Sequence, residues 1–345
     1  SSRFGSSGCL STRLGAAGRL AARMAAQDAT SPPTSGADLI SWLFSRRRAW
    51  LELADGTTFE GFSFGHEGST AGEVVFNTGM VGYPESLTDP SYAGQILVLT
   101  FPLIGNYGVP DEERDALGLL AHFESERIHI KAMVVSDYSF AGSHYTAKRT
   151  LGQWLKEQKV PGIYGVDTRA LTKLIRVHGA ILGKVIVDGC EPSGAPGFAD
   201  PNKTNLAASV SRRKPQVFLP PPLPAAAPAP EEAVGQPAKP MPKIVAVDCG
   251  MKNNIIRYLA IELRVHLTVV PWDYDFTNDD FDGLFLSNGP GDPTMCEKTV
   301  GHVRQVMASR PNCPIFGICL GNQILGLAAG ATTFKMKFGN RGMNQ

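Results

Sequence analysis

The sequence predicts an α/β protein of two domains, a β-rich α+β domain followed by a doubly wound parallel-sheet domain. Three observations support this class. The chain has 345 residues, about twice the length of an ordinary domain. β-type runs crowd its first half, whereas short apolar runs alternate with helical patterns in its second half. A Pro- and Ala-rich segment separates the two halves.

The composition excludes two classes of protein. No run of 18 or more apolar residues occurs, so we expect neither a membrane-spanning helix nor a membrane partner. Lys and Arg number 33 and Asp and Glu 32, which gives a net charge of +1. That balance argues against a nucleic-acid partner held mainly through phosphates.

Residues 1–50 have the composition of a leader. They hold seven Arg, no Lys and no Glu, and they are rich in Ser and Ala. Such a basic, acid-poor segment resembles a mitochondrial transit sequence, with amphipathic potential around Leu10–Met24. The alternatives for this segment are a disordered leader or a wrongly joined exon. The alternative location for the protein is the cytoplasm.

Residues 51–214 are predicted to form the first domain. Leu51–Leu53 and Thr57–Phe64 alternate on either side of Asp55-Gly56, which is a hairpin signal. Two further runs have the composition of buried strands, Ala71–Asn77 and Gln95–Thr100. Helical spacing of apolar residues then predicts three helices, at Glu113–His122, Leu151–Gln158 and Asp167–His178.

Residues 215–242 are predicted to be a linker and residues 243–345 the second domain. Eight prolines and six alanines lie between Pro220 and Pro240, too little apolar surface to order a core. Beyond them, four short apolar runs alternate with helical segments, as in a parallel sheet covered on both faces. These predicted strands are Ile244–Val247, Leu267–Val270, Leu284–Leu286 and Ile315–Gly317.

The segment Gly317–Gly321 has the form G-x-C-x-G between an apolar strand and a helical run. This is the layout of a nucleophile elbow with Cys319 in the nucleophile position. A helix N-terminus favours the thiolate, and the N–H of Leu320 points where an oxyanion would form. The alternative is a buried structural cysteine.

A second glycine-rich turn, Asn288–Pro293, follows the preceding strand. Because the carboxyl ends of parallel strands share one edge of the sheet, both turns belong to the same edge. Gly289 and Gly291 leave backbone N–H groups exposed, which suits a second oxyanion donor or a small substrate. An ordinary surface turn is the other interpretation.

The cysteines predict neither a disulfide scaffold nor a metal site. Six cysteines in 345 residues are too few for a scaffold, and none forms a C-x-x-C pair. We therefore expect free thiols. The six are Cys9, Cys190, Cys249, Cys296, Cys313 and Cys319.

Six sequence segments resemble a known family. FLSNGPGDP (Phe285–Pro293) and FGICLGNQ (Phe316–Gln323) resemble the glutaminase domain of class I glutamine amidotransferases. Four others resemble the small subunit of carbamoyl-phosphate synthetase, and the likeness covers roughly residues 50–345. These four are Val74–Tyr92, Pro102–Pro110, Gly165–Arg176 and Val245–Arg257.

The resemblance implies a reaction and a set of residues. Cys319 would attack the side-chain amide of glutamine, release ammonia and form a thioester that water hydrolyses. The N–H groups of Leu320 and Gly289 would stabilise the oxyanion. The residues that would bind glutamine are Ser91, Gly289, Gly291, Leu320 and Gln323.

The partner implied is the synthetase half of the enzyme, in trans or fused, which uses ATP and bicarbonate. No cofactor and no metal are expected in this chain. The family's catalytic His and its Glu partner follow a segment that resembles Phe338–Gln345. We therefore expect this stretch of chain alone to be inactive.

The Asn at position 322 is similar to the residue found at this position in the mitochondrial, urea-type branch of the family. The cysteine at position 319 indicates that glutamine is used. The cytosolic pyrimidine-pathway branch is the alternative. Two other hypotheses stay open: a non-catalytic pseudo-glutaminase that serves as a scaffold, and an unrelated α/β cysteine hydrolase.

Overall fold

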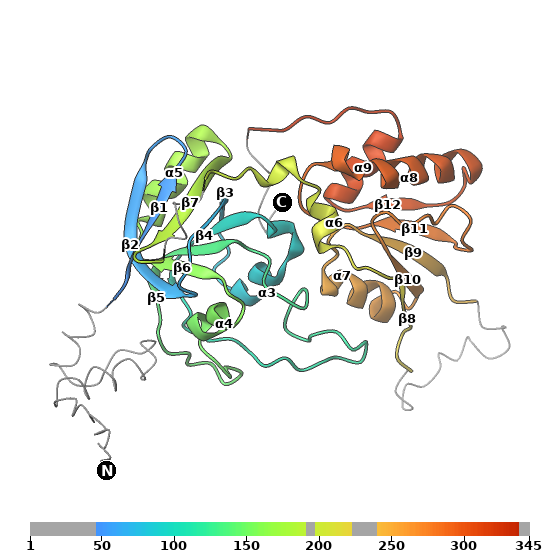
Figure 1. Cartoon of the computed structure of the whole chain (residues 1–345). Helices are drawn as coiled ribbons and strands as arrows, with labels where there is room; N and C mark the ends of the chain where they lie inside the picture. The colour runs from blue at the N-terminus through green and yellow to red at the C-terminus, as the bar shows by residue number, and fades with distance from the viewer. Residues whose placement is uncertain (1–45, 191–196, 223–239, 338–345) are drawn as a thin grey trace, which may run out of the picture. The chain divides into compact units, whose positions relative to one another are not determined.

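Seven strands of the first half close into a barrel, in a computed structural model that describes residues 46–190, 197–222 and 240–337 (Figure 1). The strand order is β1-β2-β6-β5-β4-β3-β7, and β7 pairs with β1 to complete the ring. β3 to β6 run parallel to their neighbours in that part of the ring, and the other pairs are antiparallel. The strands are β1 (Arg48–Leu53), β2 (Thr58–Gly65), β3 (Thr70–Asn77), β4 (Gln95–Ile104), β5 (Ala132–Tyr138), β6 (Pro161–Tyr164) and β7 (Ile181–Val187).

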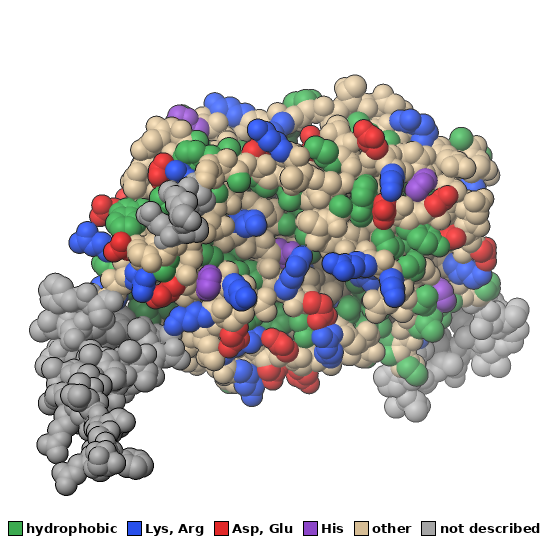
Figure 2. Space-filling model, viewed as in Figure 1, with side chains coloured by type: hydrophobic (Ala, Val, Ile, Leu, Met, Phe, Trp, Pro, Cys, Tyr) green, Lys and Arg blue, Asp and Glu red, His purple; other side chains and the backbone are tan. Residues whose placement is uncertain are grey.

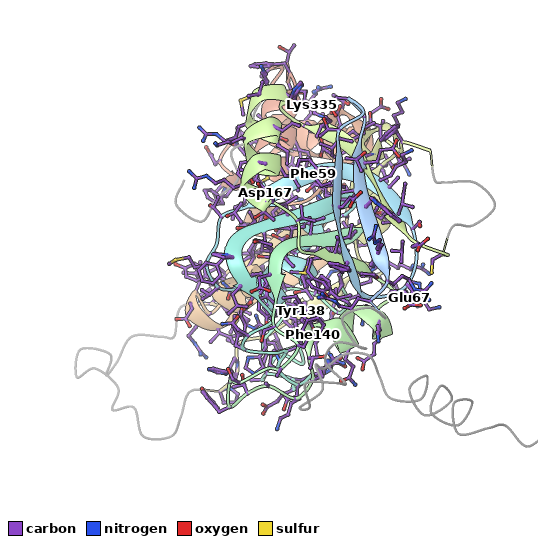
Figure 3. The ribbon with its side chains drawn as sticks, turned by 90° about the vertical axis from the view of Figure 1, so that its left-hand side faces the viewer. Phe59, Glu67, Tyr138, Phe140, Asp167 and Lys335 are labelled. Carbon is purple, nitrogen blue, oxygen red and sulfur yellow. The ribbon has the colours of Figure 1, made fainter. Side chains whose placement is uncertain are left out.

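Strands β1 and β7, which close the ring, alternate between buried residues and more exposed ones. In β1 the residues Ala49, Leu51 and Leu53 are fully buried, while their neighbours face outward. Outside the ring lie α3 (Tyr83–Thr88), α4 (Leu151–Glu157) and α5 (Thr168–His178). Figure 3 shows Asp167 at one end of α5, where its carboxylate accepts from the N–H of Ala170 and caps the helix. Tyr138, the last residue of β5, packs against Phe140, with ring centroids 4.6 Å apart (Figure 3).

One predicted helix is wrong. Residues 113–122 form turns and an isolated bridge between Arg114 and Leu120 instead. Their apolar spacing serves another purpose, because Leu119 packs into the core of the second domain. The helices predicted at Leu151–Gln158 and Asp167–His178 are confirmed as α4 and α5.

The second half forms the doubly wound sheet that the sequence predicts. Its order is β12-β11-β9-β10-β8, so the chain leaves β9 first toward β10 and then returns to its other side. The four parallel strands are β9 (Lys243–Asp248), β10 (His266–Pro271), β11 (Gly283–Leu286) and β12 (Ile315–Gly317). The order reverses between β9 and β11, which is where ligands bind in such sheets.

Helices cover both faces of this sheet. Figure 1 shows α8 and α9 on one face and α7 on the other. The helices and turns are α7 (Asn253–Arg257), the π-turn η4 (Tyr258–Glu262), η5 (Pro293–Cys296), α8 (Glu297–Ser309) and α9 (Leu320–Ala328). Arg264, just after η4, takes φ 52°, a conformation that favours glycine.

Part of the predicted linker 215–242 belongs to the sheet. Residues 216–218, assigned to the linker, form β8 (Gln216–Phe218), which pairs antiparallel with β10 at the edge of the sheet. Before it, α6 (Leu206–Val210) follows the 3-10 turn η2 (Pro201–Lys203) and buries Ala207 in the core of the second domain. Residues 223–239, the larger part of the predicted linker, and residues 1–45 of the predicted leader lie outside the described residues.

Backbone contacts fix the turn between β12 and α9. A Cβ on Gly321 would overlap the carbonyl of Leu286 at the end of β11, and one on Gly317 would overlap the backbone of Gly321. The N–H of Ile318 donates to the Leu286 carbonyl at 3.0 Å, and that of Gly321 donates to the Ser287 carbonyl at 3.0 Å. The turn is therefore hydrogen-bonded to the end of β11, and its glycines let the two backbones pack without space for a side chain between them.

A loop of the barrel grips the start of α7. The N–H of Asn253 donates to the carbonyl of Glu124 at 2.8 Å, and the N–H of Asn254 donates to its carboxylate at 3.0 Å. Arg257 forms an ion pair with Asp115 at 2.7 Å. A second tie comes from the segment after α9, where Lys335 (Figure 3) donates to the buried carboxylate of Glu73 at 3.1 Å.

Charged side chains of both signs are mixed on the surface. On the face drawn in Figure 2, basic and acidic side chains are interspersed rather than separated by sign. Every helix in the described part of the chain falls short of the length and apolar content needed to cross a bilayer.

Gly321→Ala should destabilise the protein, because its methyl group has no space against Leu286. We expect the free energy of unfolding to fall by about 3 kcal/mol or more. Gly326→Ala is the matched control in the same helix, since a Cβ there meets only Ala331 at 4.0 Å. It should be neutral or stabilise by about 0.5–1 kcal/mol. Urea unfolding of both variants measures the difference, and equal stabilities would contradict this packing.

Acid should weaken the fold through His129. Burial, helped by Arg127 and opposed by Asp89 and Asp248, lowers the pKa of His129 to about 4. The unfolded chain, with an ordinary histidine pKa, binds more protons between about pH 6.5 and pH 4, so the free energy of unfolding falls as the pH falls through this window. The contribution is about 3 kcal/mol at most. His129→Gln should flatten this part of the pH profile of urea unfolding; superimposable profiles would contradict the assignment.

Candidate active site

Cys319 lies at the tip of the turn between β12 and α9. Its backbone has φ 53° and ψ −112°, a left-handed conformation that costs a non-glycine residue about 1–3 kcal/mol. α9 begins at the next residue, so the side chain stands at the helix N-terminus. The side chain is exposed. The predicted strand–turn–helix geometry is therefore present, and Cys319 is not a buried structural cysteine.

The other described cysteines are less accessible. Cys249 and Cys296 are fully buried, and Cys190 and Cys313 are half-buried, and all are free thiols. The side-chain contact with Cys296, together with burial, raises the pKa of the Cys249 thiol. A reagent in solution therefore meets the sulfur of Cys319 most readily among the described cysteines.

Gly289 and Leu320 lie against each other beside Cys319. A Cβ on Gly289 would lie 3.0 Å from Cδ2 of Leu320, and would overlap the carbonyl of Cys249. Within the described residues, neither the N–H of Gly289 nor that of Leu320 has a hydrogen-bond partner. The two N–H groups predicted to act together therefore come from neighbouring turns and are both available to an acceptor.

Gly291 and Gln323 extend the two turns in different ways. Gly291 takes φ 89°, and a Cβ there would lie 3.2 Å from Cβ of Leu206, so α6 lies close beside this turn. Gln323 is in the first turn of α9, where its N–H donates to the Cys319 carbonyl at 3.2 Å. Its side chain is exposed and hydrogen-bonds to no other predicted site residue in the described part of the chain.

Ser91 is brought to the second domain's edge by the barrel. It lies in the 3-10 turn η1 (Pro90–Tyr92), and its Oγ accepts from Nδ2 of Asn288 at 3.0 Å. The same amide nitrogen donates to the Gly250 carbonyl at 2.9 Å. Asn288 thus joins the barrel, the end of β9 and the Gly289 turn at one point.

An ion pair that the sequence did not single out supports this point. Lys252 lies 2.8 Å from the buried carboxylate of Asp89, whose other oxygen accepts from the N–H of Ser91 at 2.9 Å. The charge of Asp89 raises the pKa of Lys252 against the opposing effect of burial. Both residues occur in the segments that resemble the family, but only their pairing in space shows that they hold the turn of Ser91.

Within the described residues, the sulfur of Cys319 makes no hydrogen bond to an imidazole or a carboxylate. The site as described is therefore an exposed thiol beside two available backbone N–H groups and a polar junction with the barrel. That arrangement fits attack on a carbonyl carbon with stabilisation of the resulting oxyanion.

Two family models match the chain, in the order that the sequence motifs indicate. The family described as "Carbamoyl-phosphate synthase small chain, CPSase domain" matches residues 51–185. The family described as "Glutamine amidotransferase class-I" matches residues 245–345. The first corresponds to the barrel and the second to the doubly wound sheet.

Curated relatives are similar over most of the chain. The "Multifunctional protein CAD" of Squalus acanthias is 50% identical over 297 residues, 86% of this chain and 12% of the relative. The "Multifunctional protein URA2" of Saccharomyces cerevisiae is 49% identical over 86% of this chain and 14% of the relative. The human "Carbamoyl-phosphate synthase [ammonia], mitochondrial" is 46% identical over 88% of this chain and 20% of the relative.

This chain therefore spans between an eighth and a fifth of the length of these relatives. Two of them are named as multifunctional proteins and one as mitochondrial, so the likeness is to the family rather than to one branch. With its small-chain domain followed by a class-I glutamine amidotransferase domain, the chain belongs to the carbamoyl-phosphate synthase family.

Proposed function

We propose that this chain is the glutaminase part of a glutamine-using carbamoyl-phosphate synthase. It would hydrolyse glutamine to glutamate and ammonia and pass the ammonia to a synthetase portion, which uses ATP and bicarbonate. The observation that carries the proposal is the exposed thiol of Cys319, held in a strained conformation at the start of α9 beside the Gly289 turn.

The proposed reaction has two halves. The sulfur of Cys319 bonds to the side-chain amide carbon of glutamine, and the N–H groups of Leu320 and Gly289 stabilise the oxyanion. The C–N bond then breaks, the nitrogen leaves as ammonia after gaining a proton, and a thioester remains. Water attacks the thioester, releases glutamate and regenerates the thiol.

Residues from both domains would bind the substrate. Ser91 approaches from the barrel, while Gly291 and Gln323 belong to the two turns of the sheet. The Ser91–Asn288 hydrogen bond supports this assignment, because it holds a barrel hydroxyl next to the Gly289 turn. No cofactor and no metal enter this part of the reaction.

The general base would come from outside the described residues. The family resemblance assigns that role to a His with a Glu partner, downstream of the segment like Phe338–Gln345. We propose that glutamine hydrolysis requires this His and its Glu partner. The synthetase portion would be fused or would bind in trans, and the multifunctional relatives support fusion.

A second candidate is a non-catalytic scaffold that regulates a synthetase portion. The exposed, strained cysteine favours catalysis, because a scaffold has no need of that conformation.

Cys319→Ala should abolish glutamine hydrolysis in the full-length protein while leaving carbamoyl phosphate synthesis from added ammonia intact. A glutamine-analogue electrophile should label Cys319 in the wild-type protein and should not label the Cys319→Ala variant at this position. Cys313→Ala, which removes a half-buried thiol, is the control and should be labelled like the wild type. Ammonia release and mass spectrometry of the labelled peptide are the measurements. Full glutaminase activity in Cys319→Ala would exclude Cys319 as the nucleophile, whereas an inert wild-type protein would leave the scaffold as the better account.

Residues 1–50 should carry a fused fluorescent reporter into mitochondria. The reason is their charge, seven Arg against two Asp, which suits import driven by a membrane potential. Replacing the arginines among residues 1–24 by Gln provides the control and should leave the reporter in the cytosol. Cytosolic signal from the unaltered fusion would instead favour the pyrimidine-pathway branch.

A further inference from the structure

The turn that carries Ser91 is held from behind by a second segment of the barrel. Thr88, the last residue of α3, is buried, and its hydroxyl accepts from the N–H of Glu124 at 2.9 Å. Its carbonyl accepts from the hydroxyl of Ser125 at 2.5 Å. The N–H of His129 donates to the carbonyl of Leu87 at 2.9 Å. Residues 124–129 therefore hold the end of α3 from which η1 begins.

The imidazole of His129 completes this contact. Its Nε2 lies 3.0 Å from Oγ of Ser125. A serine hydroxyl has one proton, and the carbonyls of Thr88 at 2.5 Å and Arg127 at 3.1 Å can only accept it, so Ser125 donates its proton to these carbonyls. Ser125 must then accept from His129, which requires the proton of the imidazole on Nε2. Neutral histidine in this tautomer provides the bond.

Charged groups surround His129 from several segments. Arg127 is a near neighbour in sequence, Asp89 belongs to the turn of Ser91, and Asp248 ends β9. Because burial and Arg127 keep the pKa of His129 low, the ring stays neutral at neutral pH. The hydrogen bond from Nε2 to Ser125 is therefore the main polar constraint on this ring.

We propose that His129 is a positioning residue for glutamine: acting through the Ser125 hydroxyl, it holds the Thr88–Ser91 segment so that Ser91 meets Asn288. This inference rests on the proposed function, because it assigns His129 a role in the binding of that substrate. His129 acts only through Ser125 and is not itself a catalytic residue.

The test is the kinetics of glutamine hydrolysis by the full-length protein. His129→Leu removes the donor and should raise KM for glutamine about tenfold, with kcat changed less than about threefold. His129→Gln retains an N–H donor and should restore KM to within about threefold of wild type. His144→Leu is the control, since His144 is exposed and its side chain bonds only within its own turn.

A double-mutant cycle tests the route. If His129 acts through Ser125, Ser125→Ala should raise KM as His129→Leu does, and the double variant should resemble either single one. Independent, multiplying effects would overturn the route. If His129→Leu fails to fold, Ser125→Ala still decides the question, because an unchanged KM in Ser125→Ala would overturn the proposal.

A separate measurement needs no activity. Nitrogen-15 NMR of His129 in this chain should show the Nε2–H tautomer, and the Nδ1–H tautomer would overturn the proposal. Ser91→Ala separates the two levels of inference. If Ser91→Ala leaves KM unchanged, the proposed glutamine site fails; if Ser91→Ala raises KM but His129→Leu does not, only the role of His129 fails.

Discussion

Close backbone packing at the reversal point of the sheet is the constraint on which the site depends. Gly289, Gly317 and Gly321 lie where a Cβ atom would overlap a neighbouring backbone. The two turns are thus held by the strands beneath them and not by adjustable side chains. Because its neighbours cannot shift, Cys319 keeps a conformation that an isolated turn would abandon.

The junction between barrel and sheet domain is polar where it approaches this edge. Lys252–Asp89 and Arg257–Asp115 are partly buried ion pairs, and Asn288 adds neutral hydrogen bonds. Ion pairs of this kind contribute little net stability but tolerate few alternative alignments. The junction is therefore better suited to fixing the register of Ser91 against the Gly289 turn than to holding the domains together by affinity.

Local patterns made much of the fold predictable. The strands β9 to β12 follow apolar runs bounded by turn residues, and the Cys319 turn follows from glycines two residues away on each side. Contacts between distant segments could not be predicted. Nothing in the sequence near Asp89 indicates Lys252 as its partner, and the closure of β7 on β1 is equally remote. The helix predicted at Glu113–His122 is wrong because the apolar residues there do not form one face of a helix. Leu119 packs instead into the core of the sheet domain.

The strand β8 has a consequence for how the polypeptide is divided. It lies before residues 223–239 in the chain, yet it forms the outer strand of the sheet that follows them, and Ala207 of α6 is buried in the same domain. Proteolytic cleavage between residues 222 and 240 would leave the first fragment with part of the sheet domain's hydrophobic interior, namely Leu119, Ala207 and Phe218. The two pieces should remain associated after such a cut, as complementing fragments do, rather than separate as autonomous domains.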